Sequence, residues 1–149
     1  MNEIRVKRML LGGLAMFVVF IAAEILIEHV IGKMLFGDLI QELWLETVAP
    51  SALSPLNQAL NLFIAVLNST VLIWLYASLR PMYGVGTKTA LITSALGITW
   101  AASMIVNLIN LGLLPAQLGL MEMVFEAVEL PIAMIAGAGV YEGVRKEAE

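Results

Sequence analysis

Four long apolar stretches constrain this chain more than any other feature of its sequence. They cover about 9–31, 56–79, 88–111 and 120–142, and a helix of about 20 such residues crosses about 30 Å of hydrocarbon. The composition agrees, because 60% of the 149 residues are hydrophobic and 13% are charged, whereas about a quarter are charged in soluble domains. The sequence therefore predicts an all-α, polytopic membrane protein: a four-helix bundle forming a single transmembrane domain over 1–149.

The basic residues predict the orientation of this bundle. Of the eight Lys and Arg residues, only Lys33 lies in the connection between the first and second stretches. The other seven lie on the opposite side, which the positive-inside rule assigns to the cytoplasm. We therefore expect both termini to be cytoplasmic (N-in/C-in), in a bacterial cytoplasmic membrane. The seven residues are Arg5, Lys7, Arg8, Arg80, Lys88, Arg145 and Lys146.

The first outer connection carries a helical pattern of its own. Within about 36–48, apolar residues such as Leu39, Leu43 and Trp44 recur at helical spacing, and acidic and amide residues occupy the other face. This pattern predicts a short amphipathic helix in the first outer loop. Two roles are open for it: an interfacial helix that connects two spans, or a lid over a site at the mouth of the bundle.

Polar residues follow one face of each predicted span. At about 100° per residue, positions three, four and seven apart share a helix face. Lipid offers these side chains no hydrogen-bond partner, so they are expected to face the bundle interior or a water-filled cavity. Since the polar faces lie mainly in the outer halves of the spans, they predict one polar pocket that opens outward. Its predicted lining is Glu24, Glu28, Asn57, Asn61, Asn68, Trp100, Ser103, Asn107, Glu122, Glu126 and Glu129.

The cytoplasmic half of the bundle is expected to be closed and well packed. Ala133 and Gly137, like Gly139 and Gly143, are small residues four positions apart in the last span. Small residues at this spacing allow two helices to approach closely. Both pairs are therefore predicted to lie at helix contacts.

The acids in the predicted pocket suggest acid/base chemistry. Several carboxylates in a low-dielectric site repel one another when all are ionised, so a protonated glutamic acid beside an ionised one would form an acid and base pair. Glu126, Glu129 and Glu24 are the candidate catalytic residues. The remaining residues of the predicted lining would bind a small amphipathic or cationic molecule, and whether the protein is an enzyme stays open.

Two non-enzymatic functions compete with this hypothesis. The acidic face could be the interface of an accessory or structural subunit of a membrane complex, or the chain could be a proton-coupled small transporter that acts as a dimer. The expected partners are membrane lipids, the ligand, and a second copy or another membrane subunit. No cofactor, metal or nucleic acid is expected: the single histidine, His29, turns off the face of Glu28 and does not provide the two Glu-x-x-His motifs of di-iron bundles.

The loop "RPMYGVGTKTA" at 80–90 contains glycines, but it lacks the G-x-x-x-x-G-K-[ST] spacing of a nucleotide-binding loop. Arg80 and Lys88 are expected to anchor helix ends near lipid headgroups, and Thr87 to cap the third span. The segment "LYASLRPMYGVGTKTALITSALGITWA" resembles small bacterial four-span membrane proteins of uncharacterised activity that carry an R-P-x-x-G-x-G-x-K-T loop. The resemblance implies a four-span bundle and no particular reaction.

Overall fold

The computed structural model describes residues 5–47 and 54–143, and every regular element in these ranges is a helix. Four helical segments are long and apolar enough to cross a membrane, which confirms the predicted all-α fold with four candidate spans. The first of them is continuous from Val6 to Phe36 and contains a stretch of wider π-helix. In chain order the elements are α1 (Val6–Glu24), η1 (the π-helical stretch, Ile25–Gly32), α2 (Lys33–Phe36), α3 (Leu39–Thr47), α4 (Pro55–Tyr83), α5 (Thr87–Asn110) and α6 (Ala116–Glu142).

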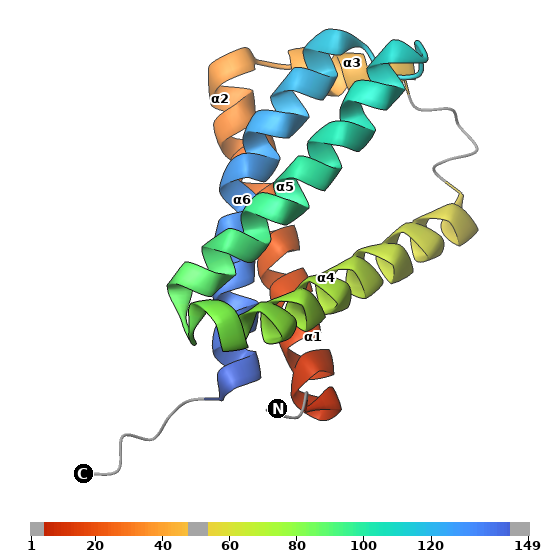
Figure 1. The fold of residues 1–149 in the computed structure, drawn as a ribbon. Helices are drawn as coiled ribbons and strands as arrows, with labels where there is room; N and C mark the ends of the chain where they lie inside the picture. Colours follow the sequence, from red (N-terminus) through yellow and green to blue (C-terminus); the bar gives the residue numbers. More distant parts are fainter. Residues whose placement is uncertain (1–4, 48–53, 144–149) are drawn as a thin grey trace.

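The helices are not arranged as four parallel rods (Figure 1). Helix α6 packs along both α1 and α5, and α4 packs mainly against α1. From the turn that joins them, α4 and α5 diverge, so the N-terminal half of α4 leaves the bundle (Figure 1). All the buried residues of α4 accordingly lie in its C-terminal half: Ser69, Ile73, Tyr76 and Ala77.

Glycines allow α1 and α6 to approach closely in the inner half. A Cβ atom added at Gly137 would lie 2.7 Å from the Cβ of Met16 and 2.8 Å from the carbonyl oxygen of Gly12. Ala133, one turn earlier, is fully buried. Gly139, in contrast, is exposed and has no neighbour within 4 Å of the same added atom. The Ala133 and Gly137 pair therefore lies at a helix contact as predicted, and the prediction for Gly139 is wrong because that residue faces away from α1.

Replacing Gly137 with alanine should lower the free energy of unfolding by about 1–3 kcal/mol, because the added methyl group meets backbone and forces the two helices apart. Replacing Gly139 with alanine is the matched control and should be neutral or stabilising by up to about 1 kcal/mol, since alanine favours a helix over glycine. Denaturation of both variants in the same detergent would compare them. Equal destabilisation by the two changes would contradict this account of the contact.

The helix ends follow from local sequence. Ser54 caps α4 by accepting a hydrogen bond from the Asn57 N–H at 3.3 Å, and Pro55 fits the first helical position because it needs no N–H there. After α5, Gly112 takes a left-handed φ of 71°, and Leu113 N–H donates to the Leu108 carbonyl at 2.9 Å. Helix α5 therefore has a glycine-terminated end, in which the glycine just after the helix takes the left-handed conformation.

Two predicted details of the 80–90 loop are wrong. Helix α4 continues past Pro81 and ends at Tyr83, because proline removes only one hydrogen bond so near a helix end. The residue that precedes α5 is Gly86, with φ 118°, and Thr87 is the first helical residue. Gly86 is needed there because a side chain is strained at this φ.

The ends of α1, α4 and α6 lie together at one end of the bundle. Arg8 near the start of α1 donates to the Glu142 carbonyl at the end of α6 at 2.8 Å, and Arg80 of α4 also binds Glu142. The described basic residues other than Lys33 lie at this end, and α2 and α3 lie at the other (Figure 1). Arg145 and Lys146 lie outside the described residues. The side of the membrane that each end faces remains a prediction, as does an interfacial position for α3.

Candidate functional site

Five glutamates from two helices converge in the half of the molecule that contains α3. On α6 they are spaced four and three positions apart, which places them on one helix face. Glu28 and Glu122 lie close enough to share a hydrogen bond, and Glu122 also interacts electrostatically with Glu24 and Glu126. We call this set the acidic cluster: Glu24, Glu28, Glu122, Glu126 and Glu129.

Glu129 lies at the buried centre of the acidic cluster. Its exposed fraction is 2%, and the Glu129 Oε1 atom has no hydrogen-bond partner among the described residues. The carboxyl group interacts with Glu24 of α1 and with Glu122 and Glu126 of α6. A buried polar atom without a partner costs about 1–3 kcal/mol. The fold therefore holds at least one acceptor in the cluster that its own donors do not satisfy.

The π-helical stretch η1 explains how α1 contributes to the cluster. In a π-helix each N–H bonds to the carbonyl five residues earlier, which widens the turn and is often found at functional sites. Residues four and five positions after Glu24 therefore lie close to it around the helix. Glu24, Glu28 and His29 line the same cavity, so His29 belongs to the lining of this site although it does not share the face of Glu28.

A cavity of about 570 Å³, here called cavity 1, lies between η1, α3 and the start of α6. Three members of the acidic cluster form its acidic wall, and Trp44 of α3 donates a long hydrogen bond of 3.4 Å from Nε1 to Glu122 Oε1. The ion pair of Lys33 with Asp38, with 3.2 Å between Nζ and Oδ1, forms part of the rim. Helix α3 thus supplies a wall of cavity 1, with Ile40, Gln41, Trp44 and Leu45.

A second cavity, of about 360 Å³ and here called cavity 2, lies between α1, α4, α5 and α6. Its lining is mainly apolar, and Glu126 is the one charged residue that the described chain contributes to it. Asn68 of α4 and Trp100 of α5 line it and are exposed, Trp100 to 62%. Cavity 2 therefore opens outward between α4 and α5, where the two helices diverge (Figure 1).

The structure divides the predicted site residues into four groups. Cavity 1 is lined by Glu24, Glu28 and Glu122, and cavity 2 by Asn68, Trp100 and Glu126. Glu129 is buried between the acids that line cavity 1 and the acid that lines cavity 2. The other four predicted residues line neither cavity: Asn57, Asn61, Ser103 and Asn107.

The prediction of one lumen lined by four polar faces is therefore wrong. Asn61, Ser103 and Asn107 are exposed, because α4 diverges from α5 and none of the described helices packs between their outer halves. Ser103 satisfies its hydroxyl within its own helix by donating to the Thr99 carbonyl at 2.8 Å. Asn57 is half-buried, beside the cap of α4. Helix faces were assigned from spacing alone, and spacing does not say how far neighbouring helices lie apart.

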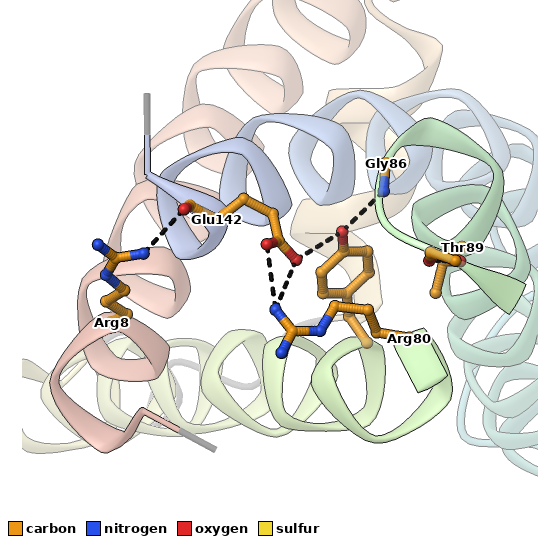
Figure 2. Close-up of polar contacts among 7 residues, drawn as sticks. Arg8, Arg80, Gly86, Thr89 and Glu142 are labelled. Atoms are coloured by element: carbon orange, nitrogen blue, oxygen red, sulfur yellow. Dashed lines mark hydrogen bonds and ion pairs between the residues drawn. The ribbon is translucent and has the colours of Figure 1, made fainter. Parts of the chain in front are cut away.

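A polar group at the opposite end of the bundle was missed by the sequence analysis (Figure 2). Arg80 Nη1 lies 3.1 Å from both carboxylate oxygens of Glu142, and Tyr76 donates to Glu142 Oε1 at 3.1 Å. The Tyr76 hydroxyl also accepts the Gly86 N–H at 3.1 Å. This arrangement, here called the Glu142 tie, joins α4, α6 and the turn before α5.

The Glu142 tie also packs against aromatic rings. The Arg80 guanidinium carbon lies 5.5 Å from the centre of the Tyr141 ring, and Tyr141 meets Tyr76 edge to face with 6.0 Å between ring centres. Arg80 is therefore held by Glu142 and Tyr141, and its expected position near the lipid headgroups stays a prediction. The sequence did contain a sign of this ion pair. Glu142 is an acid at the end of the fourth span, and Arg80 is a base at the end of the second, so the two were predicted to lie at the same depth in the membrane.

The acidic cluster offers many hydrogen-bond acceptors and few donors. Carboxylates bind cationic groups strongly, and a carboxyl pair can also transfer protons. Within 5–47 and 54–143, no three Asp, Glu, His or Cys side chains are arranged so that they could hold a metal ion. Comparison of the chain with protein-family models, curated proteins and solved structures finds no match.

Proposed function

We propose that this membrane protein binds a small organic cation, with or without an apolar part, in the acidic cluster. The observation that carries the proposal is Glu129, a buried carboxylate whose Oε1 has no partner in the described chain. A ligand that brings a positive charge or an N–H donor would supply what the fold leaves unsatisfied.

The charges around the cluster support a cation. In the described chain, the basic side chain that interacts electrostatically with the acidic cluster is His29, through Glu24. Lys33 on the rim of cavity 1 already forms an ion pair with Asp38. Cavity 1 is within the size range of small-molecule sites. Trp44 on its wall could stack on an ammonium group through its ring face.

The positions of the basic residues support the predicted orientation as part of this proposal. The described basic residues other than Lys33 lie at the Glu142 end, so the positive-inside rule places that end in the cytoplasm and cavity 1 at the outer, non-cytoplasmic side of a bacterial cytoplasmic membrane. The chain has no cysteine, so Asp38→Cys provides a single labelling site. Labelling by an impermeant reagent only in broken cells would contradict this orientation.

Binding of tetramethylammonium to the protein in phosphatidylcholine nanodiscs tests the proposed function. Glu126→Gln and Glu129→Gln should each weaken binding at least about tenfold, because each removes an acidic group of the cluster: Glu126 lines cavity 2 and Glu129 is the buried acid one turn further along α6. Glu46→Gln is the matched control, since Glu46 is an exposed acid that lines neither cavity, and it should bind like the wild type. Isothermal titration calorimetry measures the affinities. Wild-type affinity in both cluster variants would contradict the proposal.

The same variants separate the two alternative functions. If the cation binds but also accumulates in proteoliposomes under a pH gradient, the protein is a proton-coupled transporter. That function is favoured by the carboxylates that lead from cavity 1 through Glu129 to Glu126 in cavity 2.

If the variants bind the cation normally but lose association with another membrane protein, the chain is an accessory subunit. The exposed amides of Asn61 and Asn107 favour that function, because amides in lipid need partners.

A further inference from the structure

We infer that the cation is amphiphilic: its alkyl chain occupies cavity 2 while its charged head binds the acidic cluster. This inference rests on the proposed function and adds the chemical class of the ligand. It also assigns cavity 2 the role of holding the alkyl chain, whereas a cation without such a chain would need only the acidic cluster. The proposal therefore concerns a ligand that approaches from the membrane rather than only from water.

The lining of cavity 2 suits an alkyl chain. Phe20, Leu72, Met104 and Leu130 contribute apolar surface from four different helices. Among the described residues, this lining contains no Lys or Arg that could form an ion pair with Glu126. The charge of an amphiphile would therefore be directed to the end of the cavity where Glu126 interacts with Glu122 and Glu129.

The position of cavity 2 allows the alkyl chain of the ligand to enter from the bilayer. Its mouth lies between α4 and α5, where Asn68 and Trp100 are exposed. Both helices are long and apolar enough to span the membrane, so the mouth faces lipid in the bilayer. A tryptophan at such a position presents an apolar ring to the chain and an N–H to a polar head. An amphiphile dissolved in the bilayer can therefore enter sideways.

The head and chain sites meet at Glu126. This residue is half-buried, lines cavity 2 and belongs to the acidic cluster. Glu129, one turn further along α6, carries the unpartnered oxygen. One molecule can thus place its charge among the carboxylates and its chain between α1, α4 and α5.

Two probes with the same head test the inference in phosphatidylcholine nanodiscs: tetramethylammonium and decyltrimethylammonium. Each methylene transferred from water into an apolar site contributes about fourfold in affinity. The decyl probe should therefore bind far more tightly to the wild type, after the signal of empty nanodiscs is subtracted. Decanol, which has the chain without the charge, should compete weakly.

Filling cavity 2 should remove this preference for the long chain. Ala101→Phe adds a ring to the cavity wall, and Ala65→Phe does so from α4, in case the first variant does not fold. Either should reduce decyltrimethylammonium binding at least tenfold and leave tetramethylammonium binding within about twofold of wild type. Ala95→Phe is the control, because Ala95 is exposed on α5 and lines neither cavity.

Other outcomes distinguish this inference from the proposed function. If the wild type binds both probes equally, or if the filled variants keep the preference for the long chain, the inference is overturned and the cation site stands. If neither probe binds, the proposed function fails as well. If Ala101→Phe alters only the oligomeric state, a helix of another molecule occupies cavity 2, and the alkyl-chain assignment is wrong.

Discussion

Glu129→Met should stabilise the fold while it weakens cation binding. Methionine fills a similar volume, and it removes a buried oxygen that has no partner in the described chain. Removing an unsatisfied buried polar group is worth about 1–3 kcal/mol, and replacing buried charges with well-packed apolar residues is often stabilising. The free energy of unfolding in a fixed detergent should therefore rise by an amount in this range.

The control for this prediction is Glu126→Met. Glu126 is half-buried, and its carboxylate oxygens are not among the buried atoms of the described chain that lack a partner, so its replacement should change stability by less than about 0.5 kcal/mol. Both variants should weaken tetramethylammonium binding. A destabilised Glu129→Met protein would show that the carboxylate contributes to folding, which would remove the main support for a ligand at this position.

Such an opposition between stability and binding is expected at a functional site. Residues retained for binding often cost the fold some stability, and stabilising replacements at such positions impair function. In the described chain the acidic cluster shows this cost at Glu129. In the Glu142 tie the carboxylate is satisfied, because it accepts from two side chains, and the buried atom without a partner there is the Nε of Arg80.

Glu142→Ala should be among the most destabilising single changes in the chain. It leaves the Arg80 guanidinium, which is only 16% exposed, without its counter-ion, and removing one partner of a buried ion pair costs about 3–5 kcal/mol. Because Glu142 itself is 23% exposed, water can partly replace it, and we expect the lower end of that range. Denaturation in detergent would measure the loss.

A double-mutant cycle checks whether this loss comes from the pair. Arg80→Met combined with Glu142→Ala should be more stable than the sum of the two single effects predicts, since neither charge is then left alone. Tyr76→Phe should cost about 1 kcal/mol, because it removes one hydrogen bond to Glu142 and leaves the ion pair. Strictly additive effects of Arg80→Met and Glu142→Ala would show that the contact contributes little to stability.

The sequence by itself determined the four long helices and about half of their ends. Membrane crossing depends on the length and apolarity of one segment, and caps such as Ser54 and Gly112 act on neighbouring residues. The shared face of Glu122, Glu126 and Glu129 also followed from spacing within one helix. Each of these features is local along the chain, so no knowledge of other helices was needed.

Tertiary structure decided everything that depends on the distance between helices. Arg80 and Glu142 are 62 residues apart in the chain and meet only because α4 and α6 converge at one end. Asn61 and Asn107 stay exposed because α4 and α5 diverge toward the other. The spacing of polar residues fixes the direction of each side chain around its own helix axis. Which side chains of different helices come into contact is set by helix packing, such as that of Gly12 against Gly137, and by the angle at which α4 crosses the other helices.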